Sequence, residues 1–332
     1  MSHQLQNAAK VLLPLLLGGA ILYWMYRDFD FRQIEQTMRH GMHWSWMLLS
    51  LPFGITAQLF RGLRWRQTLS PLGEHARRST SVYAVFLSYA TSLVIPRIGE
   101  FVRCGVLKRY DHVNFAKSLG TVVTERAVDS IVVLIVTAAT LLLQLRVFNR
   151  FFVTTGTRLD QILGRFTTTG YLVTFICLIA TIVLLGILMR SMKLSRKVKD
   201  TASNLWQGII SLKNVDNMPL WLFYTIAIWL SYFIHFYLTF YCFDATAHLG
   251  INSGLVAFVV GSIAVIVPTP NGAGPWHFSV KTMLILYGIE SNTALMFVLI
   301  VHTVQTTLVV LLGILAWAAL ALMKPLPAPA DQ

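Results

Sequence analysis

Long apolar segments alternate with short polar ones along almost the whole chain. Six of them have about the length, roughly 20 residues, that a helix needs to cross the hydrocarbon core of a membrane. No small-residue cleavage site follows the first segment, so we expect it to stay as a membrane helix rather than leave as a signal peptide. The pattern predicts an all-α multi-pass membrane protein with spans near 11–26, 44–60, 118–145, 170–190, 219–243 and 291–323.

Two further apolar segments, 80–96 and 253–269, end in proline and glycine. Broken helices at membrane depth are tolerated where protein or a water-filled cavity covers them, and a pair in corresponding halves indicates a transport site between internal repeats. Proline and glycine also occur in ordinary membrane helices, so two crossing segments are the alternative. We expect re-entrant broken-helix hairpins in inverted repeats, one over about 1–145 and one over about 170–323.

Composition and charge agree with this interpretation. Hydrophobic residues make up 55% of the chain and charged residues 12%, with a net charge of +13 and a mean hydropathy of +0.63. Such a chain has too little charge for a soluble enzyme, a disordered chain or a nucleic-acid-binding domain. If both broken segments are re-entrant, most cations, including those at 61–79 and 190–218, share one side with both termini. The positive-inside rule therefore favours re-entrant segments, cytoplasmic termini and cytoplasmic basic loops.

Ionisable residues inside membrane spans are costly and are functional candidates by default. Glu125 and Asp129 are four residues apart and share a helix face, and Arg126 can pair with Asp129. A purely structural ion cluster is the alternative.

Two more groups of candidates follow the broken segments. After the first break come Arg97, Glu100 and Arg103 at three-residue spacing, with Gly99 allowing a tight turn. Arginine suits phosphate recognition, whereas a surface ion pair is the simpler alternative. After the second break, a proline- and glycine-rich stretch indicates a broken helix with exposed backbone groups; its candidates are Pro270, Asn271, Gly272, Gly274 and His277.

Other chemistry is sparse in the sequence. His302 and Gln305 share a face of the last apolar segment, where a histidine is more often a hydrogen-bonded packing residue than a proton carrier. Cysteines 104, 177 and 242 are widely spaced and predict small buried residues rather than disulfides or metal ligands. We expect no catalytic residue, metal or cofactor, and one membrane domain over 1–324 with a proline-rich tail at 325–332.

Four motifs in a fixed order carry a family resemblance. Together they make the whole chain similar to the flippase-like lysylphosphatidylglycerol synthase transmembrane region family, also called uncharacterised protein family 0104. The motifs are Arg61-x-x-Arg64-Trp65, Pro96-Arg97-x-Gly99-Glu100-x-x-Arg103, Glu125-Arg126-x-x-Asp129 and Pro270-Asn271-Gly272-Ala273-Gly274.

The resemblance implies lipid translocation through two inverted repeats with re-entrant helices. The family includes the membrane half of the multiple peptide resistance factor, whose separate aminoacyl-transferase domain makes the lipid; we expect no synthase activity in this chain, which ends at Gln332. The family usually reads Pro-Gly-Gly-x-Gly followed three residues on by glutamate. Here Asn271 takes the second position and His277 the acid's place, where a protonated histidine could bind an anionic headgroup or make the site pH-sensitive.

The sequence therefore favours a lipid flippase or scramblase whose partners are membrane lipids with anionic phosphate headgroups, not nucleic acid. One alternative is a membrane enzyme acting on lipid-linked phosphate or sugar through Glu125, Asp129 and His277; another is a non-transporting scaffold for a lipid synthase. Pairing with a second copy or with a synthase stays open. The predicted headgroup path contains Arg61, Arg64, Arg97, Gly99, Glu100, Arg103, Glu125, Arg126, Asp129, Pro270, Asn271, Gly272, Gly274 and His277.

Overall fold

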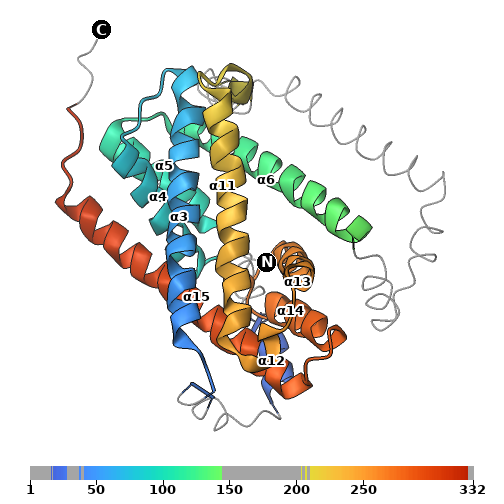
Figure 1. Cartoon of the computed structure of the whole chain (residues 1–332). Coiled ribbons are helices and arrows are strands. Elements are labelled where there is room, and N and C mark those ends of the chain that lie inside the picture. Colours follow the sequence, from blue (N-terminus) through green and yellow to red (C-terminus); the bar gives the residue numbers. More distant parts are fainter. Residues whose placement is uncertain are drawn as a thin grey trace, which may run out of the picture.

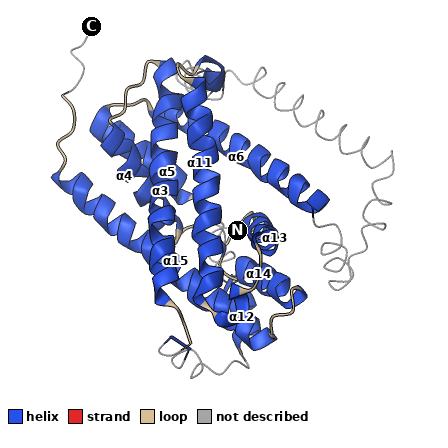
Figure 2. Cartoon of the chain, viewed as in Figure 1, coloured by secondary structure: helices blue, strands red, loops and turns tan. Residues whose placement is uncertain are grey.

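The computed structural model of the chain describes residues 16, 18–27, 37–38, 41–143, 203, 206–207 and 210–327, and this part contains helices and no strands (Figures 1 and 2). Residues 18–26 are helical, within the first predicted span. The α-helices that follow are α3 (Trp44–Leu69), α4 (Arg78–Ser92), α5 (Ile98–Asp111), α6 (Phe115–Leu143), α11 (Met218–Tyr237), α12 (Asp244–Ala247), α13 (Ile251–Ala264), α14 (Pro275–Leu286) and α15 (Ser291–Leu322). Short 3-10 turns are η1 (Ser70–Leu72), η2 (Ser211–Asn214), η3 (Leu238–Cys242) and η4 (Pro270–Gly272).

Four predicted spans coincide with the long helices α3, α6, α11 and α15, and the one at 170–190 lies outside the described residues. One boundary is wrong. The stretch at 61–79 was expected to be a basic cytoplasmic loop, but α3 continues to Leu69 and Arg61 and Arg64 are buried. A hydropathy pattern ends the apolar segment at these arginines, because a charged side chain is costly in a membrane. It takes no account of the carboxylates on another helix that neutralise them.

Two stretches of the described chain, Met218–Cys242 and Ser291–Leu322, are long and apolar enough to cross a membrane. Their exposed faces carry large apolar side chains. A surface of this kind is unfavourable in water and favourable in lipid. The exposed side chains include Leu222, Phe223, Ile226 and Leu230 on α11 and Leu311, Ile314, Leu315 and Trp317 on α15.

Two hairpins of short helices accompany the long ones. α4 and α5 are joined by residues 93–97, and α13 and α14 by residues 265–274. Their 12 to 15 residues give each arm a length of about 18–23 Å, less than the roughly 30 Å of the hydrocarbon core. An isolated arm is therefore too short to cross a membrane.

The order of elements in the first half recurs in the second: a long helix, a hairpin, then a long helix. α3 and α11 lie side by side and run in opposite directions (Figure 1). The first arm of each hairpin packs on the last long helix of the other half, α4 on α15 and α13 on α6. The two halves are thus interlocked rather than separate.

The hairpins enter the bundle from opposite ends. At one end, which we call the first end, Arg77 joins the start of α4 to Asp111 at the end of α5 and to the Lys324 carbonyl after α15. At the other, the second end, His43 before α3 bonds to Asp244 of α12, close to the start of α13. The tips meet in the interior, where Arg97 Nη2 donates to the Ile266 carbonyl oxygen across 3.4 Å.

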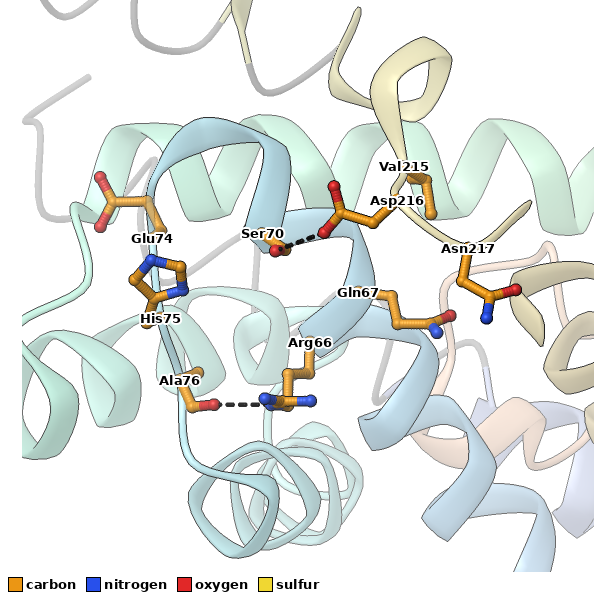
Figure 3. A pocket seen from close by; sticks show the side chains of 9 residues that line it. All are labelled: Arg66, Gln67, Ser70, Glu74, His75, Ala76, Val215, Asp216 and Asn217. Carbon is orange, nitrogen blue, oxygen red and sulfur yellow. Dashed lines mark hydrogen bonds between the residues drawn. The ribbon is translucent and has the colours of Figure 1, made fainter. Parts of the chain in front are cut away.

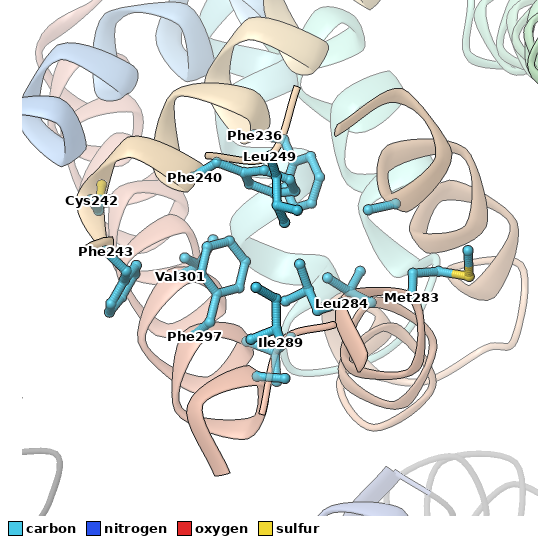
Figure 4. Close-up of a cluster of buried hydrophobic side chains, with 14 of the residues drawn as sticks. Phe236, Phe240, Cys242, Phe243, Leu249, Met283, Leu284, Ile289, Phe297 and Val301 are labelled. Carbon is cyan, nitrogen blue, oxygen red and sulfur yellow. The ribbon is translucent and has the colours of Figure 1, made fainter. Parts of the chain in front are cut away.

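Apolar packing holds each hairpin in place. Around the second one, Phe236 and Phe240 face Phe297 of α15 and Leu284 of α14 (Figure 4), with the Phe240 and Phe297 rings in edge contact at 5.4 Å. The first hairpin packs on α3 through a separate cluster that contains Trp65, Leu69, Val85, Cys104 and Leu107.

Gly99 lets the two arms of the first hairpin touch. A Cβ atom there would lie 1.9 Å from the Ser88 carbonyl oxygen, whereas one at Gly105, on the same helix, would meet nothing within 4 Å. We predict that Gly99→Ala lowers the free energy of unfolding by about 2 kcal/mol through overpacking. Gly105→Ala should leave it unchanged or raise it by up to about 1 kcal/mol. Unfolding midpoints in detergent, followed by circular dichroism, check this; equal midpoints for the two variants would contradict it.

Candidate functional site

A cluster of charged side chains is buried between three helices in the half of the bundle nearer the first end. We call it the ion cluster. Its residues are Arg61 and Arg64 of α3, Glu100 and Arg103 of α5, and Glu125, Arg126 and Asp129 of α6. Arg61 and Arg64 belong to the part of α3 that the sequence pattern assigns to a loop.

The two acidic residues at its centre each bind two arginines. Asp129 accepts hydrogen bonds from Arg61 and, at 2.9 Å, from Arg64 Nη2. Glu125 accepts from Arg103 Nη1 at 2.7 Å and from Arg64 Nη2 at 3.4 Å. The four-residue spacing of Glu125 and Asp129 places both on the face of α6 that meets α3 and α5, as the sequence predicts. The carboxylates therefore bind three helices together.

Aromatic and hydroxyl groups complete the surroundings of the buried arginines. The Arg103 guanidinium lies over the Trp65 ring, 4.6 Å from its centroid, and Trp65 donates to Thr121. Arg64 Nη1 donates to Thr225 of α11 at 3.3 Å. Such contacts stabilise a cation that has lost its water. They also account for a tryptophan directly after Arg64 in the first motif.

Two arginines of the predicted headgroup path stay accessible. The Arg126 side chain is 43% exposed, with Nε 3.2 Å from Glu100 and Nη1 3.7 Å from Asp129, the pair expected from their spacing. Arg97 is exposed at the hairpin tip and has a left-handed backbone with φ of 65°. Arg103 faces inward at 1% exposure, so it does not share an exposed phosphate-binding face with Arg97.

The ion cluster carries more positive than negative charge. Its four arginines face three carboxylates, which leaves one positive charge. Several guanidinium N–H groups, among them Arg61 Nε, Arg64 Nε and Arg103 Nη2, are buried without an acceptor in the described part of the chain. Unsatisfied buried donors are costly and favour an anionic acceptor nearby.

The tip of the second hairpin is built from residues with left-handed backbone. Asn271, Gly272 and Gly274 have φ of 50°, 72° and 91°. Asparagine tolerates this conformation better than most residues, which explains how it can stand at a position with a φ of 50°. Its side-chain Nδ2 donates to Thr306 at 2.8 Å, and its carbonyl accepts from His302 Nε2 at 3.1 Å. His302 is therefore hydrogen-bonded, as expected, and ties the tip to α15.

Beside this tip lies a cavity of about 590 Å³, which we call the His277 cavity. His277 is 3% exposed, its ring centroid lies 4.4 Å from that of His302, and its Nδ1 accepts from the Gly274 N–H. Sequence reasoning missed the contribution of the first helix, because nothing local marks it. The lining residues are Leu22, Tyr23, Tyr26, Arg27, Ala273, His277, Leu299, His302 and Thr303.

A smaller pocket of about 210 Å³ lies at the first end, between the end of α3 and the start of α11 (Figure 3). Ser70 donates to Asp216 at 2.9 Å, and Arg66 Nε donates to the Ala76 carbonyl. These bonds fix the connections around the pocket, and no sequence motif predicts it.

The remaining candidates have simpler surroundings. Gln305 is half-buried, and its Nε2 has no hydrogen-bond partner within the described ranges. Cys104 and Cys242 are buried free thiols, as expected, and Cys177 lies outside the described residues. In the part of the chain that the structure covers, no three histidine, cysteine or acidic side chains are grouped to hold a metal.

Comparison with known proteins gives one match. The sequence model of the family described as lysylphosphatidylglycerol synthase TM region matches residues 11–313. The chain belongs to this family. No curated protein and no solved structure gives a significant match. The match confirms the family inferred from the four motifs and makes the chain a membrane protein of lipid metabolism or transport.

The double role of Glu125 predicts a large stability effect. Glu125→Gln removes the charge that neutralises the buried Arg64 and Arg103, and we expect it to lower the free energy of unfolding by about 3–5 kcal/mol. Glu100→Gln breaks one half-exposed ion pair and should cost less than about 1 kcal/mol. Unfolding by denaturant in detergent measures both. Similar losses for the two variants would show that the burial of Glu125 has no energetic consequence.

The backbone of Asn271 predicts an unusual order of variants. Asn271→Gly keeps the left-handed conformation and loses only the bond to Thr306, so its unfolding free energy should fall by about 1 kcal/mol. Asn271→Val forces a β-branched residue into that conformation, and we expect a loss of more than about 2 kcal/mol. Thermal unfolding of the two variants gives the order, and a valine variant as stable as the glycine variant would rule out backbone conformation as the cause.

Proposed function

We propose that this protein is a flippase or scramblase that moves an anionic phospholipid or lipid phosphate between the leaflets of a bacterial inner membrane. The observation that carries the proposal is the ion cluster, which has one positive charge in excess and lies next to the meeting point of two broken hairpins. A membrane interior tolerates such charges only with a partner or water, and they commonly mark the path of a polar substrate.

The proposed topology has both hairpins re-entrant and the two halves as inverted repeats. The opposite entry of the hairpins and the crosswise packing of their first arms on α15 and α6 support it. We place the first end in the cytoplasm, together with both termini. Its described cations include Arg66, Arg78, Lys108, Arg109 and Lys117, whereas those toward the second end are Arg27 and Lys281, so the positive-inside rule favours this orientation.

In the proposed path, the exposed Arg126 and Arg97 contact the phosphate, and the buried members of the ion cluster position Arg126. Arg97 stands at the hairpin tip among exposed apolar residues such as Val94 and Ile266. The headgroup can therefore follow the arginines while the acyl chains remain against apolar surface. Lipid phosphate and arginine form charge-assisted hydrogen bonds, which offset part of the cost of removing the phosphate from water.

The contacts of the acidic residues favour transport over an enzymatic reaction. A general base needs an oxygen that can take a proton. Asp129 and Glu125 each accept hydrogen bonds from two arginines, which stabilise the ionised form and occupy the carboxylate oxygens. This supports a role in positioning cations.

We predict that Arg126→Gln and Arg97→Gln each slow translocation at least about tenfold. The measurement uses purified protein in vesicles that contain fluorescent phosphatidylglycerol, with dithionite quenching of the outer leaflet to give the rate. Arg109→Gln removes an exposed arginine in the last turn of α5, at the first end of the bundle, and is the matched control, with an expected rate equal to that of the original chain.

Two results would contradict the proposed function. One is translocation by neither the original chain nor Arg109→Gln under these conditions, which would favour a scaffold. The other is a covalently altered lipid, detected by mass spectrometry of the vesicle extract, which would favour the membrane enzyme.

A further inference from the structure

The His277 cavity lies in the other half of the bundle from the ion cluster. Its first-helix wall begins where Gly18 lies against the Ala273 carbonyl and continues toward the second end, where the Tyr26 hydroxyl donates to the Leu295 carbonyl near the start of α15. The hairpin tips, joined by Arg97 and Ile266, separate the cavity from the ion cluster. The ion cluster and the His277 cavity are therefore two distinct sites, one on each side of the hairpin tips.

The hydrogen bonds of the two histidines leave one donor without a partner. His302 uses Nε2 toward the Asn271 carbonyl and Nδ1 toward Thr306. His277 Nδ1 accepts from Gly274, so the neutral ring carries its proton on Nε2. No hydrogen bond joins Nε2 to a residue that the structure describes, and His277 lines the cavity, so this N–H is available to a ligand there.

The lining of the His277 cavity is suited to an anionic amphiphile. Arg27 supplies a guanidinium, and among the residues that the structure describes none of those lining the cavity carries a carboxylate. Leu22, Tyr23 and Leu299 provide apolar surface beside these polar groups. A volume of about 590 Å³ lies within the roughly 300–1,000 Å³ of small-molecule sites.

We propose that the His277 cavity binds the phosphate of an anionic lipid in the half of the membrane toward the second end, with His277 Nε2–H and Arg27 as its ligands. The apolar wall takes the glycerol and the adjoining acyl carbons. This assignment rests on the proposed function and extends it, because it adds a second site for the same class of lipid. It also names a selectivity: because the described lining has a guanidinium and no carboxylate, a phosphate is favoured over a cationic headgroup.

Binding to the full chain in detergent tests the assignment directly. The probes are dioctanoyl phosphatidylglycerol, dioctanoyl phosphatidylcholine and glycerol 3-phosphate, and native mass spectrometry gives the affinities. Arg97→Gln in the background weakens the site at the hairpin tip, so that the His277 cavity dominates. We expect phosphatidylglycerol to bind at least about tenfold more tightly than phosphatidylcholine, and glycerol 3-phosphate at millimolar concentration not to compete.

Variants in the same background locate the site. His277→Leu and Arg27→Gln should each weaken phosphatidylglycerol binding about tenfold, and His277→Gln, which keeps an N–H donor, should weaken it less. His248→Leu, an exposed histidine at the second end, is the matched control and should bind normally. Unfolding midpoints identify any variant that fails to fold, and Arg27→Gln then decides the outcome because Arg27 belongs to a different element.

Three results would overturn the assignment: unchanged affinity in both His277→Leu and Arg27→Gln, equal affinity for the two lipids, or competition by glycerol 3-phosphate, which would indicate a site for free phosphate esters. These results are independent of translocation. A chain that binds phosphatidylglycerol through His277 without moving it would contradict the proposed function and leave this site intact. A chain that moves the lipid, but whose His277→Leu and Arg27→Gln variants bind phosphatidylglycerol normally, would contradict this site and leave the proposed function intact.

Discussion

The buried ion cluster is the constraint on which the arrangement of the helices depends. In lipid, apolar faces gain little by meeting one another, so helix association rests on close packing and polar contacts. An uncompensated ion in the interior costs several kcal/mol, and only a partner of opposite charge removes that cost. Glu125 and Asp129 supply such partners to arginines of α3 and α5 at once. Arg64 also donates a hydrogen bond to Thr225, which connects α11 to the ion cluster. The charges therefore specify which helices are neighbours, and the apolar clusters fill the space that this choice leaves.

Fixing α5 also fixes the tip of the first hairpin, since Arg97 directly precedes that helix. The tip then meets the second hairpin at the Ile266 carbonyl, a backbone acceptor that an unbroken helix would have used internally. Each tip holds a residue other than glycine in the left-handed conformation, Arg97 in one and Asn271 in the other. Both residues make a side-chain contact to a distant element. Specific side-chain bonds therefore hold both tips, together with the positive-φ residues Gly272 and Gly274 in the second one.

Some of this organisation is readable from the sequence, because the signals are local. Apolar length predicts α3, α6, α11 and α15, and proline with glycine marks both breaks. The pairing of Arg126 with Asp129 follows from helical spacing. The features that the sequence does not predict depend on partners far away along the chain. Arg61 lies in a basic stretch typical of a loop, and its carboxylate is 68 residues away on another helix. Arg103 likewise points into the bundle because it pairs with Glu125, which lies on another helix. The His277 cavity draws on the first helix, the second tip and α15, and no segment of the chain displays that combination.

The balance of charge, more than the number of cations, suits a transported lipid. Four unpaired arginines at membrane depth would hold a phosphate strongly, and a strongly bound lipid leaves slowly. The three carboxylates of the ion cluster compete for the same guanidinium groups and leave one positive charge, which matches the single negative charge of a phosphodiester. The lining of the His277 cavity contains Arg27 as its one guanidinium beside two histidines, so under the proposed assignment it too has no large excess of charge. Under the proposed function, the carboxylates are as necessary to transport as the arginines, because they set how weakly the phosphate is held.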